Sequence, residues 1–314
     1  MSLEIDKIKA LIAKKNQKDY DYASGHVSVD DGLDVIDNTH KFNAMSVTEK
    51  MMYPAKLTRL VHKGYLLSVM VFGSAGIGKT YGVMKELEDS GRTWVKTEEE
   101  TSSMTEADMD SLLDQPNPTL IKISGNITPK GLYKLFYRHR HGFILVFDDC
   151  DDVLLNKIMA NQLKAALDSG VEERVITWET SRPEEGLPNS FVFKSQVIFI
   201  SNMTADKVDK AVRSRSADIN LVLTPDEAYE HIGNVLPFIN NTRLINGDPV
   251  KIDLPEKTNR GIFEKISERR HELPEYSFRT FKMAQSLYSF CEEEGEPEGA
   301  WFDLWDHQQD KISQ

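Results

Sequence analysis

The sequence predicts an α/β fold in which helices flank a five-stranded parallel sheet and a small helical domain follows. Three observations favour this fold. Short apolar segments and helical patterns alternate between residues 65 and 224, as they do in βα units. A glycine-rich turn joins the first of these apolar segments to a helix. From Pro225 to Cys291 the apolar residues recur at helical spacing.

Length, charge and cysteine usage limit the class of protein. The 314 residues suffice for two modest domains or for one large domain with an appendage. A net charge of −12 argues against a chain-wide basic surface, although a local nucleic-acid patch is compatible with it. The only cysteines, Cys150 and Cys291, indicate no disulfide framework, and no apolar run approaches membrane-spanning length. We therefore expect a cytosolic protein, in the host cytoplasm if it is viral, with no membrane partner.

The chain divides into four expected segments. Residues 1–64 form a helical extension, which either docks on the main domain or serves as an arm for a neighbouring subunit or nucleic acid. Residues 65–224 form the α/β core and include an acidic, solvated insertion over 97–114. Residues 225–292 form the helical domain, and 293–314 form an acidic linker with an aromatic tail. This tail either packs on the helical domain or docks on a partner.

The first apolar segment leads into a phosphate-binding loop. Gly73, four further residues and then Gly78-Lys79-Thr80 satisfy the P-loop pattern, and they lie between a strand and a helix as that motif requires. Glycines let several backbone N–H groups point at one phosphate, and the lysine adds a mobile positive charge. A dinucleotide loop is excluded because position 81 is tyrosine, which leaves a ligand-free turn as the alternative. The residues expected to contact phosphates are Gly73, Ser74, Ala75, Gly76, Ile77, Gly78, Lys79, Thr80 and Tyr81.

The apolar segment over residues 143–147 runs directly into Asp148 and Asp149. A strand buried in a parallel sheet delivers a carboxylate at its C-terminal end, beside the P-loop. We expect Asp148 and the Thr80 hydroxyl to hold Mg²⁺, and Asp149 to polarise the attacking water. A buried strand followed by an acidic loop without chemistry is the alternative, which becomes weak once a P-loop precedes it.

A further strand, over residues 196–200, ends in Ser201 and Asn202. An amide at this position can hydrogen-bond the γ-phosphate and the attacking water without adding charge. An ordinary turn residue is the alternative for Asn202. A short helix then ends in Arg213 and Arg215, and the fifth strand follows over 218–223.

Taken together, these segments resemble the AAA+ ATPases over residues 65–292. Gly73 to Thr80 resembles Walker A, and Phe143 to Asp149 resembles Walker B. Asn202 resembles sensor 1, and the segment 212–216 resembles the arginine-finger motif, including the Ser-Arg-Cys element of clamp loaders. Glu275 to Lys282 resembles sensor 2, with Arg279 as the nucleotide contact. Within that superfamily, residues 147–151, 163–169 and 213–216 are similar to stand-alone ATPases of large tailed bacteriophages.

The resemblance implies roles for the arginines and an oligomer. Arg215, with Arg213 as the alternative, would act on the γ-phosphate of an adjacent subunit, so homo-oligomerisation is implied. Arg279 would contact the nucleotide of its own subunit, unless it only pairs with Glu275 or Glu272. One departure bears on turnover: AAA+ enzymes usually have glutamate where this chain has the shorter Asp149. Hydrolysis is then either slow or assisted by a neighbouring acid such as Asp152.

The expected activity is Mg-ATP hydrolysis. Adenine is expected because guanine-binding P-loop proteins use Asn-Lys-x-Asp, whereas Asn156-Lys157 is followed here by Ile158-Met159. The first hypothesis for the work done is remodelling or loading in DNA metabolism. The second is protein remodelling, motivated by the acidic composition and by residues 178–193, which are either a hairpin reaching toward a substrate or a surface excursion. The third is a nucleotide-dependent switch or scaffold, motivated by Asp149.

Overall fold

A computed structural model describes residues 42, 44–91, 94–95, 120–179 and 186–312 of the protein. The chain divides into two compact units, Met1–Ala44 and Met45–Gln314. The helix expected near the N-terminus and the acidic insertion over 97–114 lie outside the described residues. The expected domain boundaries after residues 64, 224 and 292 stay predictions.

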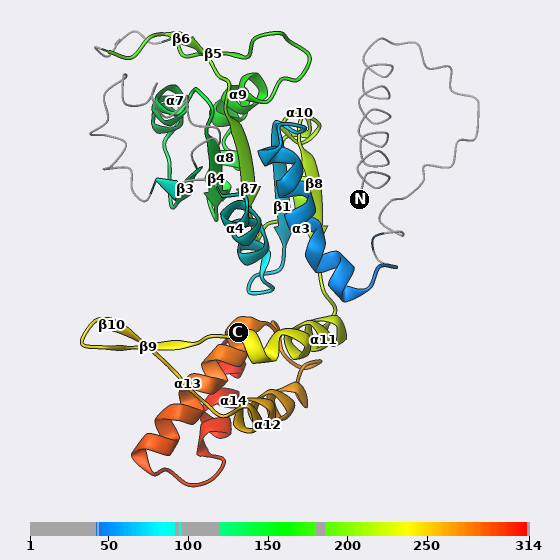
Figure 1. Ribbon diagram of the computed structural model, residues 1–314, viewed down its shortest axis with the longest axis vertical. Coiled ribbons are helices and arrows are strands. Elements are labelled where there is room, and N and C mark those ends of the chain that lie inside the picture. Colours follow the sequence, from blue (N-terminus) through cyan, green and yellow to red (C-terminus); the bar gives the residue numbers. More distant parts are fainter. Residues whose placement is uncertain (1–41, 43, 92–93, 96–119, 180–185, 313–314) are drawn as a thin grey trace. The chain divides into compact units, whose positions relative to one another are not determined.

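A parallel sheet forms the centre of the larger unit (Figure 1). Its order is β2-β3-β4-β7-β1-β8, and every neighbouring pair is parallel. The five expected strands are all present, and a two-residue strand extends one edge, so the predicted fold class is confirmed. The strands are β1 (Ser68–Gly73), β2 (Trp94–Val95), β3 (Leu120–Ser124), β4 (Ile144–Asp148), β7 (Gln196–Ile200) and β8 (Ala217–Leu221).

Helices cover both faces of this sheet because its inner strands are apolar on both faces. Met70 and Phe72 of β1 join one core cluster with helices α7 to α10, while Val69 and Val71 are buried on the other face. Helices α3 and α4 pack against each other, and α3 also contacts β1, β7 and β8 (Figure 1). The helices are α3 (Val47–His62), α4 (Lys79–Asp89), α7 (Pro129–Arg138), α8 (Asp151–Leu155), α9 (Lys157–Ala166) and α10 (Lys210–Arg213), with a short 3-10 turn over Ala205–Lys207.

Local sequence accounts for the start of α7. The Thr128 hydroxyl accepts a hydrogen bond from the Gly131 N–H at 3.1 Å, and Pro129 occupies the first helical position. Proline lacks a backbone N–H, and this costs nothing at the first helical position because an N–H there would have no partner within the helix. Thr128 is therefore the N-cap of α7.

A two-stranded antiparallel hairpin, β5 (Val175–Thr177) and β6 (Ser190–Val192), lies between α9 and β7 along the chain. Residues 180–185 lie outside the described residues, so neither alternative for residues 178–193, a hairpin reaching toward a substrate or a surface excursion, is tested.

The C-terminal part is helical, as predicted, and has its own core. It contains α11 (Pro225–Val235), a 3-10 turn (Leu236–Phe238), α12 (Glu256–Ser267), α13 (Phe278–Glu294) and α14 (Ala300–Ile312). An exposed hairpin, β9 (Thr242–Ile245) and β10 (Asp248–Lys251), was not predicted (Figure 1). Arg243 of β9 forms an ion pair with Glu293 of α13. We call residues 224–312 the lid.

The aromatic tail belongs to the lid core. Trp305 of α14 is fully buried, and its indole N–H donates to the Thr280 carbonyl at 3.0 Å. Phe302 stacks on this indole with ring centroids 5.6 Å apart. Of the two expectations for the tail, packing on the same chain is therefore the one observed.

In the part of the chain that the structure describes, no helix combines the length and the apolar character needed to cross a bilayer. The expected cytosolic location stays a prediction.

Candidate functional site

The P-loop connects the C-terminal end of β1 to the start of α4. Gly76 and Gly78 adopt positive φ angles of 67° and 96°, a region that glycine enters without steric cost. Among the described residues, the backbone N–H groups of Gly76, Gly78 and Lys79 have no acceptor. Unpaired N–H groups at the N-terminus of α4 are suited to bind an anion.

Gly73 is required by strand packing rather than by the loop itself. It pairs in register with Leu221 of β8, and its φ is 142°. A β-carbon at this position would lie 2.0 Å from the Leu221 carbonyl oxygen and 2.7 Å from the Leu221 carbonyl carbon. Both contacts are with backbone atoms, which cannot move aside as a side chain would. Glycine at this point lets β1 and β8 approach each other.

Lys79 is buried beneath the loop, with 5% of its surface exposed. Its Nζ donates to the carbonyl oxygens of Gly73 at 2.8 Å and Ser74 at 2.6 Å, and to Asn202 Oδ1 at 2.8 Å. Burial lowers the pKa of Lys79 to about 8, against the attraction of Asp149 and Asp148. The amine therefore stays mainly protonated at neutral pH.

Thr80 and Asp148 meet where α4 begins and β4 ends. The Thr80 hydroxyl donates to Asp148 Oδ1 at 3.0 Å, and the Asp148 residue is 8% exposed. Among the described residues no group of three His, Cys, Asp or Glu side chains forms a metal site. A Mg²⁺ that acts on a nucleotide usually has one or two protein oxygens and takes its other ligands from phosphates and water. The hydroxyl and carboxylate present here fit that requirement.

Asn202 joins the loop to the second acid. Its Oδ1 accepts from Lys79, and its Nδ2 donates to Asp149 Oδ1 at 2.7 Å. Asp149 has a φ of 57°, which is unusual for a residue other than glycine, and its N–H donates to the Ile200 carbonyl at 3.0 Å. This conformation turns Asp149 out of the line of β4, and both Asp149 and Asn202 are exposed. A chain of contacts thus connects Lys79, Asn202 and Asp149.

Lys122 was missed by sequence reasoning. Its Nζ lies 2.7 Å from Asp148 Oδ2, so both carboxylate oxygens of Asp148 have a partner. Lys122 lies on β3, two residues before Ser124, which pairs in register with Asp148. The signal was a single lysine within the apolar segment 120–124, on the strand that neighbours the acidic one.

The lid contacts the P-loop through the start of α13. The Phe278 N–H donates to the Gly76 carbonyl at 3.0 Å, and the next residue, Arg279, is exposed. The positive charge of Arg279 is among the causes that lower the Lys79 pKa, which places the two cations within electrostatic reach. Among the described residues Arg279 has no ion pair, because Glu272 pairs with Arg269 and Glu275 accepts from Ser277. The predicted nucleotide contact of Arg279 stays a prediction.

The other two arginines lie away from this cluster. Arg213 donates to Asp218 at 3.1 and 2.7 Å, while Arg215 donates to the Ala211 carbonyl at 2.7 Å and lies 3.7 Å from Asp168. Both precede β8, whose N-terminal end is opposite the sheet edge that carries the P-loop, because β1 and β8 are parallel. Neither arginine therefore belongs to the cluster around Lys79 of its own chain.

Two predicted loop residues differ in their surroundings. Ile77 is buried, whereas Tyr81 is 72% exposed on α4.

His231 of α11 was not predicted to lie near the P-loop. It is hydrogen-bonded to the Ile77 backbone and packs edge-on against Phe278, and burial lowers the pKa of His231. A lone histidine in a helical segment carried no signal that it would reach the P-loop.

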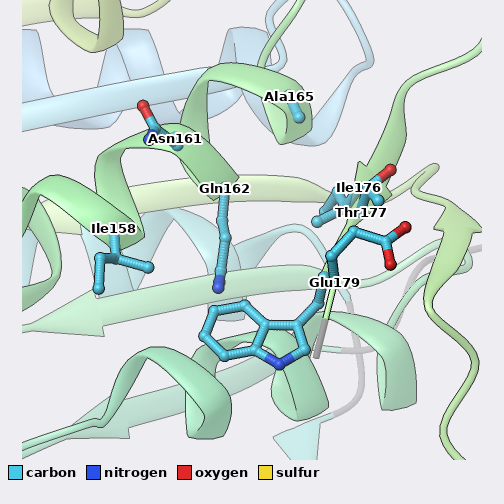
Figure 2. A pocket seen from close by; sticks show the side chains of 8 residues that line it. Ile158, Asn161, Gln162, Ala165, Ile176, Thr177 and Glu179 are labelled. Atoms are coloured by element: carbon cyan, nitrogen blue, oxygen red, sulfur yellow. The ribbon is translucent and has the colours of Figure 1, made fainter. Parts of the chain in front are cut away.

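A groove of about 220 Å³ lies elsewhere on the core, between α9 and the end of β5. Figure 2 shows Gln162 extending from α9 into the groove, with Ile158 and Glu179 on either side. The Gln162 amide donates to the Pro129 carbonyl at 3.0 Å. None of the predicted site residues lines this groove.

The strand order places the predicted motif residues relative to one another. β1, which leads into the P-loop, lies between β8 and β7, and β4 lies beside β7. Asn202 follows the end of β7, while Asp148 ends β4 and Asp149 follows it. The lid follows β8, and α13 places Arg279 near Lys79. The chain has a parallel α/β sheet flanked by helices and followed by a helical C-terminal part, in agreement with the resemblance to AAA+ ATPases in the sequence. The segments that resemble Walker A, Walker B and sensor 1 meet around Lys79, whereas Arg215 lies at the opposite edge.

Comparison with known proteins adds one relative. No family model matches the chain. An uncharacterised 36.7 kDa protein from the nrdC-mobD intergenic region of Enterobacteria phage T4 is 28% identical over 186 residues. The match includes 56% of this chain and 49% of the phage protein, so the chain spans about half the length of the curated relative.

Two solved structures are similar to the chain at TM-scores below 0.5. The FIGL-1 AAA domain in complex with ADP matches 80% of this chain and 69% of its own, at 15% identity and a TM-score of 0.34. The Thermotoga maritima RuvB Holliday junction branch migration motor matches 78% of this chain and 63% of its own, at 14% identity and a TM-score of 0.42.

Proposed function

We propose that this protein binds and hydrolyses Mg-ATP. The observation that supports this most directly is the set of contacts that joins the P-loop to two neighbouring strand ends. The Thr80 hydroxyl donates a hydrogen bond to Asp148 at the end of β4. Lys79 donates to Asn202, which follows β7, and Asn202 donates in turn to Asp149. Residues from three separate segments thus gather beside N–H groups suited to a phosphate.

Each residue has a role in the proposed reaction. The N–H groups of Gly76 and Gly78 hold the phosphate oxygens, and the Lys79 ammonium neutralises charge on the β and γ phosphates. Asp149 accepts or orients the proton of the attacking water, and Asn202 holds the γ-phosphate and that water in line. Asn202 already bonds both Lys79 and Asp149, so it is placed to align the two.

Thr80 and Asp148 would hold Mg²⁺ through the hydroxyl and a carboxylate oxygen. When bound, the metal would neutralise charge that develops on the phosphate oxygens. Lys122 pairs with the second oxygen of Asp148, which fixes the orientation of this carboxylate.

The first prediction concerns the Asp149→Asn variant, tested by phosphate release and by binding of a fluorescent ATP analogue. We expect hydrolysis to fall about 100-fold or more, as is typical for loss of a general base. Binding should change by less than about threefold, because the amide keeps the shape of the side chain.

Asp152→Asn is the matched control, since it removes the same charge three residues further along and Asp152 is an exposed residue of α8. It should keep near wild-type turnover. Wild-type turnover by Asp149→Asn would remove Asp149 from the proposed reaction, and a large loss in Asp152→Asn would transfer the role to Asp152.

We further propose that ATP hydrolysis drives remodelling or loading in DNA metabolism, motivated by the similarity of residues 214–216 to the Ser-Arg-Cys element of clamp loaders. Wild-type phosphate release should then rise in the presence of single- or double-stranded DNA, and the stimulation should weaken as salt increases. Absence of both stimulation and salt-sensitive DNA binding favours the second candidate, protein remodelling. The net charge of −12 and the β5–β6 hairpin are the observations behind that candidate.

We propose that Arg215 acts on the nucleotide of an adjacent subunit in a homo-oligomer. Arg215→Ala and Lys79→Ala should each be nearly inactive, the first because an arginine finger contributes about 1,000-fold or more. A one-to-one mixture should regain roughly a quarter of wild-type turnover, because half of the sites keep Lys79 and half of their neighbours keep Arg215.

Native mass spectrometry with ATP gives the subunit number for the same samples. Arg213→Ala is the comparison variant, because Arg213 is the alternative arginine finger. Arg213 is paired with Asp218 in its own chain. A mixture that stays inactive, or an Arg215→Ala protein with full activity, contradicts the assignment in trans.

A further inference from the structure

A carboxylate of the lid lies directly against the P-loop backbone. If Gly76 carried a β-carbon, that atom would lie 2.6 Å from Ser277 Oγ and 3.0 Å from Glu275 Oε1. The neighbouring Phe278 N–H donates to the Gly76 carbonyl at 3.0 Å. The segment 275–278 is therefore in contact with the middle glycine of the loop, and Glu275 is the charged residue within it that touches this glycine.

The position of Glu275 is electrostatically opposed to phosphate binding. The Lys79 ammonium is attracted by Glu275 and repelled by Arg279, so the lid presents one charge of each sign to the same cation. A carboxylate near unpaired N–H groups and a buried ammonium is favourable while no other anion is present. A di- or triphosphate brings several negative charges to the same N–H groups, and like charges this close repel each other.

Helix capping does not account for the Glu275 carboxylate. The start of α13 is capped by Ser277, whose hydroxyl accepts from the Arg279 N–H at 3.2 Å, and by Thr280, whose hydroxyl accepts from the Ser277 N–H at 3.0 Å. Glu275 only accepts from the Ser277 hydroxyl, at 2.7 Å. An amide oxygen at position 275 would accept the same hydrogen bond, so the negative charge has no part in the cap.

We infer that Glu275 sets the affinity of the site for nucleotides, as an internal anion that the phosphates of ATP or ADP must displace from the P-loop. The inference rests on the proposed function, since it names a residue that regulates the same site. Displacement moves the segment 275–278 away from Gly76, and α13 with Arg279 follows because it begins at Phe278. Entry of the phosphates is thereby coupled to the position of the lid.

The test is a titration of the full-length protein with fluorescent ADP and ATP analogues, for wild type and Glu275→Gln. We expect the Kd of Glu275→Gln to be about tenfold lower at low salt, and the difference to shrink at high salt. Pyrophosphate has no nucleoside, and as a competitor it should show the same gain in affinity for Glu275→Gln, because the effect acts on the phosphates. In turnover assays KM should fall while kcat changes by less than about threefold.

Glu272→Gln is the matched control, because Glu272 lies three residues before Glu275 and pairs with Arg269. It should bind nucleotides like wild type. Glu275→Ala removes the hydrogen bond as well as the charge, and it must shift the Kd in the same direction if the charge is the cause.

Equal or weaker binding by both Glu275 variants, with wild-type binding intact, overturns the inference and leaves the proposed function standing. Loss of all nucleotide binding by the wild-type protein itself would overturn the proposed function instead. The two failures are therefore distinguishable in one experiment.

Discussion

Lys79→Ala should lower ATP turnover about 1,000-fold. The reason lies in the burial of its ammonium, which acts in a medium of low dielectric where one charge has a large effect on phosphates. Alanine would also remove the hydrogen bond to Asn202, and Asn202 is the link to Asp149. Phosphate release measures the loss of turnover, and binding of a fluorescent ATP analogue measures the loss of nucleotide affinity.

Lys85→Ala is the matched control. Lys85 lies on the same helix, but it is exposed and pairs with Asp89 at 2.7 Å, a surface pair that contributes less than about 1 kcal/mol. Its removal should leave turnover within about twofold of wild type. Equal turnover by Lys79→Ala and wild type would remove the P-loop from the reaction altogether.

The pKa of Lys79 adds a pH profile to this test. Because burial lowers this pKa to about 8, the ammonium is present below pH 8 and is lost as the pH rises through that value. Nucleotide affinity should therefore be about tenfold weaker at pH 9 than at pH 7, since about nine tenths of the charge is then gone. A Kd that stays constant from pH 7 to 9.5 would contradict the role of a buried ammonium in binding.

Gly73→Ala should destabilise the fold by roughly 3–5 kcal/mol, the largest effect on stability that we expect from so small a change. The added methyl group would meet the Leu221 carbonyl at 2.0 Å, so β1 and β8 would have to separate. The φ of 142° adds backbone strain, because L-residues rarely adopt it. Thermal unfolding should show a Tm about 10 °C lower, or the protein should fail to accumulate in soluble form.

Gly64→Ala is the control for the backbone effect alone. Gly64 also has a positive φ, 79°, but a β-carbon there would meet no atom within 4 Å. It should cost about 1 kcal/mol, the usual penalty for the left-handed region. If both variants unfold at the same temperature, the close approach of β1 and β8 is not what requires glycine at position 73.

Much of the fold was predictable because its signals are local. Apolar segments of strand length marked β1, β3, β4, β7 and β8, and the hydroxyl and proline at Thr128–Pro129 marked the start of α7. The two helices α8 and α9 received no prediction. The β9–β10 hairpin was also missed, because its eight residues are all exposed and have no apolar alternation toward a core.

The pairing of Thr80 with Asp148 was predictable for a different reason. The C-terminal ends of parallel strands meet at one edge of a sheet, so a loop after one strand and an acid after another come together. Asn202 follows the same rule, since it comes directly after β7. These expectations used only the order of strands and the residues at their ends.

By itself, the sequence determined the strands, the glycine-rich turn and the acids and amide at the strand ends, because each depends on neighbours close in the chain. Only the tertiary structure decided that Lys122 pairs with Asp148 and that Glu275 lies against Gly76. Both contacts join segments whose relative position follows from packing of the sheet and the lid, which no local pattern encodes. The same packing explains why Gly73 must be glycine: its neighbour is Leu221, 148 residues away (221 − 73).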